Sequence, residues 1–270
     1  GPDALMLTIF FPESPVYVMV GLEPAGTLPI PQQIAGKDLK IYLEEVCETV
    51  ASELHRSFFI TREMDRQFRG QVTDGLFSPI LHLLVRTGHT ILGYRYVRLD
   101  ESGKLVNRPA HYIAPGRIGN KGVQIDFRTD RDRSVHSLVY LSVNLSDERL
   151  RQNKPFLRFV EGLGRVTTFL KATSYMPHQP GFSIIRNIVL DNGTAILQDD
   201  SGLPYHLYDN KRWQVQLYGD YDRPYGSFSW IEQPDLRKAY ETSKPKPLGF
   251  RIGYGFSRIP SNLLLATRRR

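Results

Sequence analysis

The spacing of apolar positions along the chain predicts a mixture of helices and strands. The clearest helix covers residues 39–54, where apolar side chains recur every three or four residues and form one face. This face contains Leu39, Leu43, Val46, Cys47, Val50 and Leu54. Because Cys47 lies on the stripe, we expect it to be a small core residue and not a nucleophile. Two shorter helices are predicted over residues 61–68 and 76–85.

Runs of β-branched and aromatic residues predict the strands. Residues 16–20 form a short, uncharged run that is typical of a central strand. Further strands are expected at residues 90–99, 123–127, 137–143, 195–198, 213–218, 228–231 and 250–254. The fold class indicated by this pattern is α/β, with a mixed β-sheet flanked by helices and α+β character in the C-terminal third.

The second half of the chain contains further helical signals. A helix is expected to begin at Asp147, and residues 156–175 read as mostly helical with an interruption near Gly162 and Gly164. Another helix is predicted over residues 234–240, and Asn262 has the character of a helix N-cap. No long polar linker separates two parts, so we predict one domain over residues 1–270, with a subdivision near residue 105 as the weaker alternative.

Composition narrows the classes of protein. The chain has 270 residues, is 41% hydrophobic and contains one cysteine, which excludes a disordered chain and a disulfide scaffold. No apolar run approaches the ~20 residues of a membrane span. The sequence lacks a G-x-S-x-G elbow, a Walker A loop, a G-x-G-x-x-G turn and paired metal-ligand spacings. It therefore predicts no metal site and identifies no cofactor.

The positive charge is concentrated near the C-terminus. The formal net charge is +7, and residues 201–270 hold 12 Lys and Arg against 6 Asp and Glu, together with 12 of the 30 aromatic residues. A nucleic-acid or polyanion surface is one interpretation, and it would use Lys211, Arg212, Lys238, Lys244, Lys246, Arg251 and Arg258. The favoured interpretation is a tyrosine-rich sheet that ends in a solvated basic tail at residues 268–270.

Adjacent carboxylates follow one predicted strand. Asp199 and Asp200 stand at its end, where carboxylates can act as general acid and base or bind sugar hydroxyls. Consecutive strand residues point to opposite faces, so the alternative is a solvated turn. Asp200 would pair with His206 only if the chain folded back through residues 202–204.

A tyrosine-rich loop at residues 218–225 is the second candidate. Asp220 and Tyr221 are typical of a site for a polar ligand, because carboxylates bind hydroxyls while aromatic faces cover sugar rings. A plain sheet edge is the alternative interpretation. The glycine-rich segment at residues 116–122 would suit a phosphate, although a hairpin loop is the favoured interpretation.

The order of several short motifs resembles that of a group of uncharacterised bacterial proteins over most of the chain. These motifs are Gly1-Pro2-Asp3, Phe10-Phe11-Pro12, Gly21-Leu22-Glu23-Pro24, Gln198-Asp199-Asp200-Ser201-Gly202 and Ser261-Asn262-Leu263-Leu264. Precursors in that group are commonly exported, so the resemblance implies a periplasmic or secreted protein, with a cytoplasmic location as the alternative. It also implies that the chain begins just inside a longer protein. It implies no activity.

The leading hypothesis is a hydrolase, or a binder of a small, sugar-like polar ligand, with a polar cleft. The catalytic candidates are Asp3, Glu23, Asp199 and Asp200. The ligand-binding candidates are Tyr205, His206, Trp213, Asp220 and Tyr221. Polyanion binding by the basic C-terminal third is the alternative, and a nucleotide-like cofactor bound beyond Val20 is a weaker third.

Overall fold

The computed structural model describes residues 7–28, 36–56, 75–109, 119–129, 132–254 and 259–269. The chain divides into two compact units. The first comprises Gly1–His55, Phe59–Asn144 and Asn153–Val160, and the second comprises Arg56–Phe58, Leu145–Gln152 and Glu161–Arg270. Each unit is described by itself. The predicted single domain stays a prediction, and residue 105 lies within a strand of the first unit.

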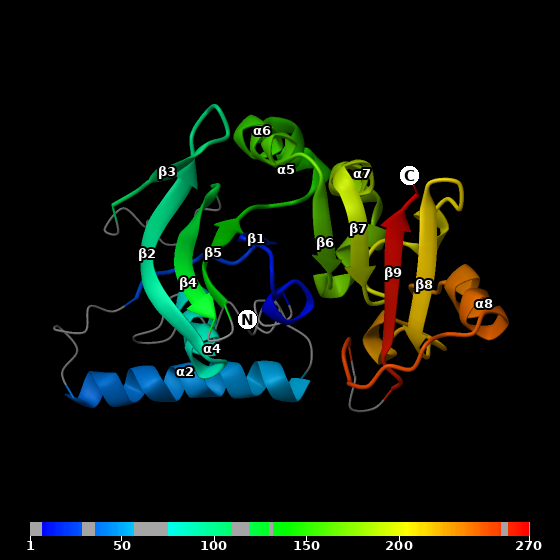
Figure 1. Ribbon diagram of the computed structural model, residues 1–270, viewed down its shortest axis with the longest axis horizontal. Coiled ribbons are helices and arrows are strands. Elements are labelled where there is room, and N and C mark those ends of the chain that lie inside the picture. Colours follow the sequence, from blue (N-terminus) through cyan, green and yellow to red (C-terminus); the bar gives the residue numbers. More distant parts are fainter. Residues whose placement is uncertain are drawn as a thin grey trace. The chain divides into compact units, whose positions relative to one another are not determined.

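The first unit contains a five-stranded mixed sheet in the order β1-β5-β4-β2-β3 (Figure 1). Its strands are β1 (Val16–Gly21), β2 (His89–Leu99), β3 (Leu105–Asn107), β4 (Lys121–Thr129) and β5 (Asp132–Ser142). Its helices are α2 (Gly36–Arg56), α4 (Phe77–Arg86) and most of α6 (Lys154–Leu163). The predicted helices and strands that fall on these ranges are confirmed.

Helix α4 supplies much of the core of the first unit. Phe77, Ile80 and Leu84 are completely buried against the alternate side chains of β4 and β5. The turn that begins the helix requires Gly75, which has φ of +79° and whose Cβ would lie 2.5 Å from the carbonyl oxygen of Pro24. This glycine therefore allows the close approach from which α4 starts.

Two predictions about the first unit are wrong. Among the described residues, the run at 16–20 forms an edge strand, β1, which pairs with β5 in parallel. Cys47 is exposed. The buried side of α2 includes Tyr42 and Val46, because the Tyr42 hydroxyl lies 2.6 Å from Ser78 Oγ and turns that side toward α4. The helix predicted at residues 61–68 lies outside the described residues.

The second unit contains a four-stranded mixed sheet in the order β6-β7-β9-β8, with β9 between β7 and β8 (Figure 1). Its strands are β6 (Val166–Leu170), β7 (Gly193–Gln198), β8 (Trp213–Gly219) and β9 (Asn262–Arg268). Its helices are α5 (Asp147–Gln152), α7 (Ser183–Asn192) and α8 (Pro234–Thr242). Helix α8 packs Leu236 and Tyr240 into the core formed by this sheet. The α/β class with mixed sheets and flanking helices is thus confirmed.

Four sequence predictions between residues 156 and 262 are wrong, each for a local reason. Residues 156–175 are not mostly helical, because Gly164 has φ of +63° beyond α6 and the β-branched residues that follow form β6. The runs at residues 228–231 and 250–254 pack aromatic side chains as irregular segments and not as strands. Asn262 begins β9 and caps no helix.

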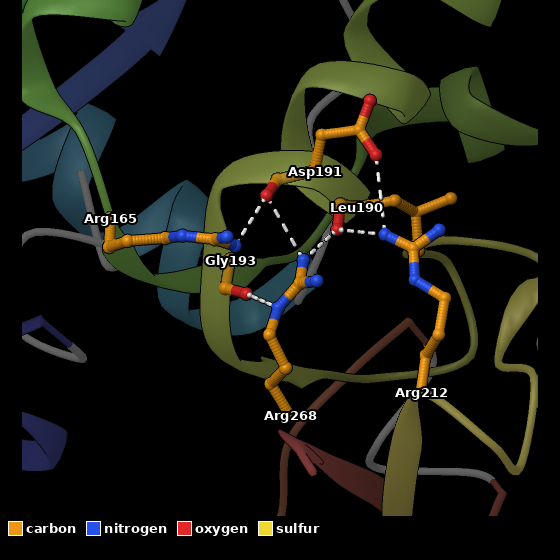
Figure 2. Close-up of polar contacts among 6 residues, drawn as sticks. All are labelled: Arg165, Leu190, Asp191, Gly193, Arg212 and Arg268. Atoms are coloured by element: carbon orange, nitrogen blue, oxygen red, sulfur yellow. Dashed lines mark hydrogen bonds and ion pairs between the residues drawn. The ribbon is translucent and has the colours of Figure 1, made fainter. Parts of the chain in front are cut away.

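Charged side chains form hydrogen bonds at both ends of helix α7. Asp147 accepts hydrogen bonds at the N-terminal end, from Ser183 Oγ at 2.6 Å and from the Ile184 amide at 2.8 Å. Three guanidinium groups converge on its last carbonyls, as Figure 2 shows; they belong to Arg165, Arg212 and Arg268. Both arrangements complement the helix dipole. Arg268 is therefore part of β9, not of the solvated tail that the sequence predicts.

Candidate functional site

The candidate site is built on the turn that follows β7. The side chain of Gln198 spans this turn, since its Nε2 donates to the Leu203 carbonyl at 2.8 Å and its Oε1 accepts from the Leu203 amide at 2.9 Å. The Tyr208 hydroxyl donates to the same Oε1 at 2.6 Å. A Cβ at Gly202 would lie 2.5 Å from that oxygen, so only glycine fits. The turn is therefore rigidly held from inside.

Asp199 and Asp200 are both buried, with exposed fractions of 1% and 6%. The solvated turn considered from the sequence is therefore wrong. Strand alternation does not separate the two carboxylates, because both residues lie beyond the last residue of β7. They instead share one buried polar network in the second unit.

Asp200 is fixed by side chains from three separate segments. Asn262 on β9 accepts from the Asp200 amide at 2.8 Å and donates to Asp200 Oδ1 at 2.9 Å. The Tyr175 hydroxyl donates to Asp200 Oδ2 at 2.5 Å. Gln233 Nε2 donates to the Asp200 carbonyl at 2.9 Å. Every oxygen of Asp200 therefore has a donor, and the carboxylate has a defined orientation.

Asp199 is satisfied on one oxygen only. Its Oδ1 accepts from the Ser201 amide at 3.0 Å and from the Ser201 hydroxyl. Its buried Oδ2 has no hydrogen-bond partner among the described residues. A Cβ at Gly253, where φ is +91°, would lie 3.3 Å from this oxygen. A side chain at Gly253 would therefore crowd the unpaired oxygen of Asp199.

The surroundings of the two carboxyl groups affect their pKa values differently. Burial and the neighbouring charge of Asp200 raise the pKa of Asp199 to about 7, although Lys171 and Ser201 oppose the shift. Burial also raises the pKa of Asp200, but the hydrogen bonds from Tyr175 and Asn262 stabilise its charged form. The geometry favours a proton on Asp199 and a negative charge on Asp200.

A strained segment lies against Asp200. Ser174 and Tyr175 are consecutive non-glycine residues with φ of 54° and 49°. Such left-handed conformations cost about 1–3 kcal/mol each and concentrate at functional sites. The ring of Tyr175 is completely buried, with Phe228 at 5.0 Å and Tyr254 at 5.7 Å between ring centroids. The strain is thus maintained by a hydrogen bond to the site and by aromatic packing.

A histidine next to this segment is electrically neutral at neutral pH. His178 has its ring 5.5 Å from that of Tyr175. Burial lowers the pKa of His178 to about 4, and the nearby His206 and Arg186 add to the effect. His178 therefore contributes no positive charge that would neutralise the carboxylates.

The predicted ligand-binding residues have different surroundings. The Tyr205 amide donates to Gln233 Oε1 at 3.2 Å, which connects it to Asp200 through Gln233. Tyr221 is buried, and its pKa is raised by burial and by the charge of Asp200. His206 and Asp220 are exposed. Trp213 is 2% exposed in the hydrophobic core, so it is packed against the protein's own side chains.

The remaining catalytic candidates lie outside the described part of the second unit. Glu23 belongs to the first unit, where its backbone carbonyl accepts a hydrogen bond from the Tyr140 hydroxyl at 2.7 Å. Asp3 lies outside the described residues. The convergence of all four carboxylates stays a prediction.

Sequence reasoning missed three residues that hold the site: Tyr175, Gln233 and Asn262. Tyr175 lies in a stretch that the sequence predicts to be helical, and Asn262 has the sequence character of a helix cap. The motif that contains Asn262 is visible in the sequence, but the contact of Asn262 with Asp200 spans 62 residues. The pairing of β7 with β9 brings Asn262 beside Asp200.

The basic residues of the alternative interpretation are partly engaged elsewhere. Arg212 forms an ion pair with Asp191 at 3.3 Å, and Lys246 Nζ lies 5.7 Å from the ring centroid of Tyr218. Arg258 lies outside the described residues. Polyanion binding stays a prediction.

Within the described parts of the chain, no group of three or more His, Cys, Asp or Glu side chains is placed to hold a metal ion. In the same residues, no helix combines the length and apolar character needed to cross a membrane. Comparisons with protein-family models, curated proteins and solved structures find no match.

Proposed function

We propose that the second unit binds a small, hydroxyl-bearing ligand at the Asp199–Asp200 pair and hydrolyses it by general acid–base catalysis. The observation that carries this proposal is the unpaired Oδ2 of Asp199, buried beside a second carboxylate whose oxygens all have donors. A structural polar network normally satisfies each buried group. The unpaired oxygen is therefore where we place a ligand's hydroxyl, which can accept a hydrogen bond from the protonated Asp199.

The two carboxyl groups take different roles. Asp199, with its pKa raised to about 7, is the acid and gives its proton to the leaving oxygen of the ligand. Asp200, oriented by Tyr175 and Asn262, is the base and takes a proton from the attacking water. One proton is donated and one is accepted, which balances a hydrolysis. If the protein only binds the ligand, the same groups receive and donate hydrogen bonds.

Ligand access requires movement, because both carboxylates are buried. The segment that contains Ser174 and Tyr175 is the natural element to open, since its backbone strain lowers the free energy needed to leave the closed state. Opening would release the Tyr175 hydroxyl from Asp200 and uncover the pair.

The direct test is turnover of a panel of nitrophenyl glycosides and esters, with binding of mono- and disaccharides followed by calorimetry. Asp199→Asn and Asp200→Asn should each reduce turnover by about 100-fold or more, the usual contribution of a general acid or base. Activity should also decline above about pH 7, where Asp199 loses its proton. Glu241→Gln, an exposed change on α8, is the matched control and should leave turnover intact.

The proposal is wrong if both aspartate variants retain the parent's turnover and ligand affinity. Circular dichroism and thermal unfolding should accompany each assay, so that loss of folding is separated from loss of chemistry. If binding is lost without any turnover in the parent, the function is ligand binding alone.

A further inference from the structure

A buried histidine in the first unit has a hydrogen-bond partner at each of its ring nitrogens. His136 lies on β5 and is 1% exposed. Its Nδ1 lies 2.8 Å from the carbonyl oxygen of Ser14, and its Nε2 lies 3.1 Å from the hydroxyl oxygen of Ser134. The function proposed above involves none of these residues, since all three belong to the first unit.

The two partners determine which ring nitrogen carries the proton. A carbonyl oxygen accepts hydrogen bonds and cannot donate them, so Nδ1 donates to Ser14. In the neutral ring, Nε2 then has no proton and accepts a hydrogen bond from the Ser134 hydroxyl. The imidazole is therefore held in the tautomer that is able to take the hydroxyl proton of Ser134.

Two aromatic rings hold the histidine in this orientation. The ring centroid of Phe127 lies 5.6 Å from that of His136 in a stacked arrangement, and the centroid of Tyr17 lies 6.2 Å away. Both residues are buried in the core of the first unit. Because the face of an aromatic ring attracts a cation, these rings also favour the imidazolium that forms when His136 takes a proton.

The serine, in contrast, is exposed at the surface. Ser134 and His136 are two residues apart on one strand, so their side chains point to the same face of the sheet. The Ser134 hydroxyl is therefore open to a reactant, while the base that it contacts is shielded from water. A nucleophile within reach of a base, which is itself oriented by a third group, is the arrangement that activates a serine.

We propose that Ser134 and His136 form a nucleophilic site at which the Ser134 hydroxyl attacks a carboxylic ester. Ser134 Oγ forms a bond to the carbonyl carbon while His136 Nε2 takes the hydroxyl proton. The bond from that carbon to the leaving oxygen breaks, and the leaving oxygen takes the proton from Nε2. Water then attacks the acyl group and gives a proton to Nε2, which returns it to Ser134 Oγ as the carboxylic acid leaves.

A fluorophosphonate probe tests this site, because an activated serine displaces fluoride from phosphorus and keeps the probe. Peptide mass spectrometry of the folded parent should find the probe on Ser134, and the urea-unfolded protein should lose this reactivity. Ser102 is the matched control, since it is exposed in the same unit but its hydroxyl donates to the Asp100 carboxylate at 2.7 Å. Ser134 should react about 100-fold faster than Ser102, the usual contribution of a general base.

Variants separate the nucleophile from the base. Ser134→Ala should abolish the labelling, and Ser102→Ala should leave it unchanged. His136→Gln retains hydrogen-bonding groups but supplies no base, so labelling of Ser134 should fall by about 100-fold in this variant, with folding checked by circular dichroism. The label is read on Ser134 itself, so the result does not depend on the Asp199–Asp200 pair.

Two results would overturn the proposal. One is a folded His136→Gln variant that is labelled as fast as the parent, because His136 would then not act as a base. The other is a folded parent in which Ser134 carries no label or reacts no faster than Ser102. This second comparison uses the parent alone, so it decides the question even if His136→Gln does not fold.

Discussion

The buried carboxylate at the N-terminus of α7 and the one in the turn after β7 differ in their hydrogen bonds and in the direction of their pKa shifts. Asp147 at the helix N-terminus is buried, yet both of its oxygens accept hydrogen bonds. Burial alone would raise its pKa, but the donors Ser183 and Ile184 outweigh burial and hold the pKa below its ordinary value. Asp199 is buried to a similar degree, has one oxygen without a donor, and has a raised pKa.

The contrast shows how differently two buried carboxylates are held within one unit. At the C-terminal end of α7, Arg268 donates to the carbonyls of Gly193 and Asp191 at 2.9 Å and 3.0 Å, and also to that of Leu190 (Figure 2). Charge there stabilises the helix. At Asp199 the charged form of the carboxyl group costs folding free energy, a cost that the proposed function would explain.

The largest expected effect concerns the pH dependence of stability. The pKa of Asp199 is about 7 in the folded state against 3.8 for the ordinary group, so the folded protein binds the proton more tightly. Stability should therefore fall as pH rises from about 4 to about 7, by about 4 kcal/mol. Asp199→Asn should remove most of this dependence and unfold at higher denaturant concentration than the parent above pH 7.

Asp147→Asn is the matched variant, and we expect it to change stability in the opposite direction at pH 7. A carboxyl group whose pKa is lowered by folding stabilises the folded protein above its unfolded-state pKa. This stabilisation is lost as the pH falls through the folded-state pKa. This variant should therefore be less stable than the parent at pH 7 and approach it in acid. If urea unfolding gave the same change in stability for both variants at every pH from 4 to 8, the contrast between Asp147 and Asp199 would be wrong.

The next effect concerns the charge at the C-terminus of α7. The guanidinium of Arg268 also lies 4.9 Å from the ring centroid of Trp213, so Arg268→Met removes helix-end hydrogen bonds and a cation–π contact together. We expect a loss of about 2–3 kcal/mol in unfolding free energy. Arg223→Met is the control. Arg223 forms a surface ion pair with Asp222 in which both side chains are 73% exposed, so this variant should change the unfolding free energy by less than about 0.5 kcal/mol. A loss no greater than that of the control would show that the arginines do not stabilise α7.

The sequence allowed the class of fold to be predicted because periodicity is a local property. The helices at residues 39–54 and 76–85 and most strands follow from spacing within the segment. The failures arose where a glycine or a distant partner decided the outcome. Gly164 separates α6 from β6, and the pairing of β1 with β5 places an apolar run at a sheet edge.

The candidate site was predictable only in part. Adjacent aspartates after a strand were visible in the sequence, and they are the centre of the network. Their burial was not visible, because it depends on Tyr175, Gln233 and Asn262, which come from three other segments. Whether a carboxylate is solvated or buried is a tertiary property, so composition of the turn alone could not decide it.

The smallest expected effect tests the strained segment that holds Tyr175 against Asp200. Ser174 has φ of 54° and an exposed side chain, so Ser174→Gly relieves the left-handed strain. The gain should be about 0.5–1 kcal/mol, because glycine's larger unfolded-state entropy offsets part of the relief. Ser229→Gly, at φ of −57°, is the control and should lower stability slightly.

If opening of this segment admits the ligand, Ser174→Gly should also slow association by about two- to fivefold in stopped-flow measurements. A stabilised variant with an unchanged association rate would show that the ligand reaches Asp199 and Asp200 by another route.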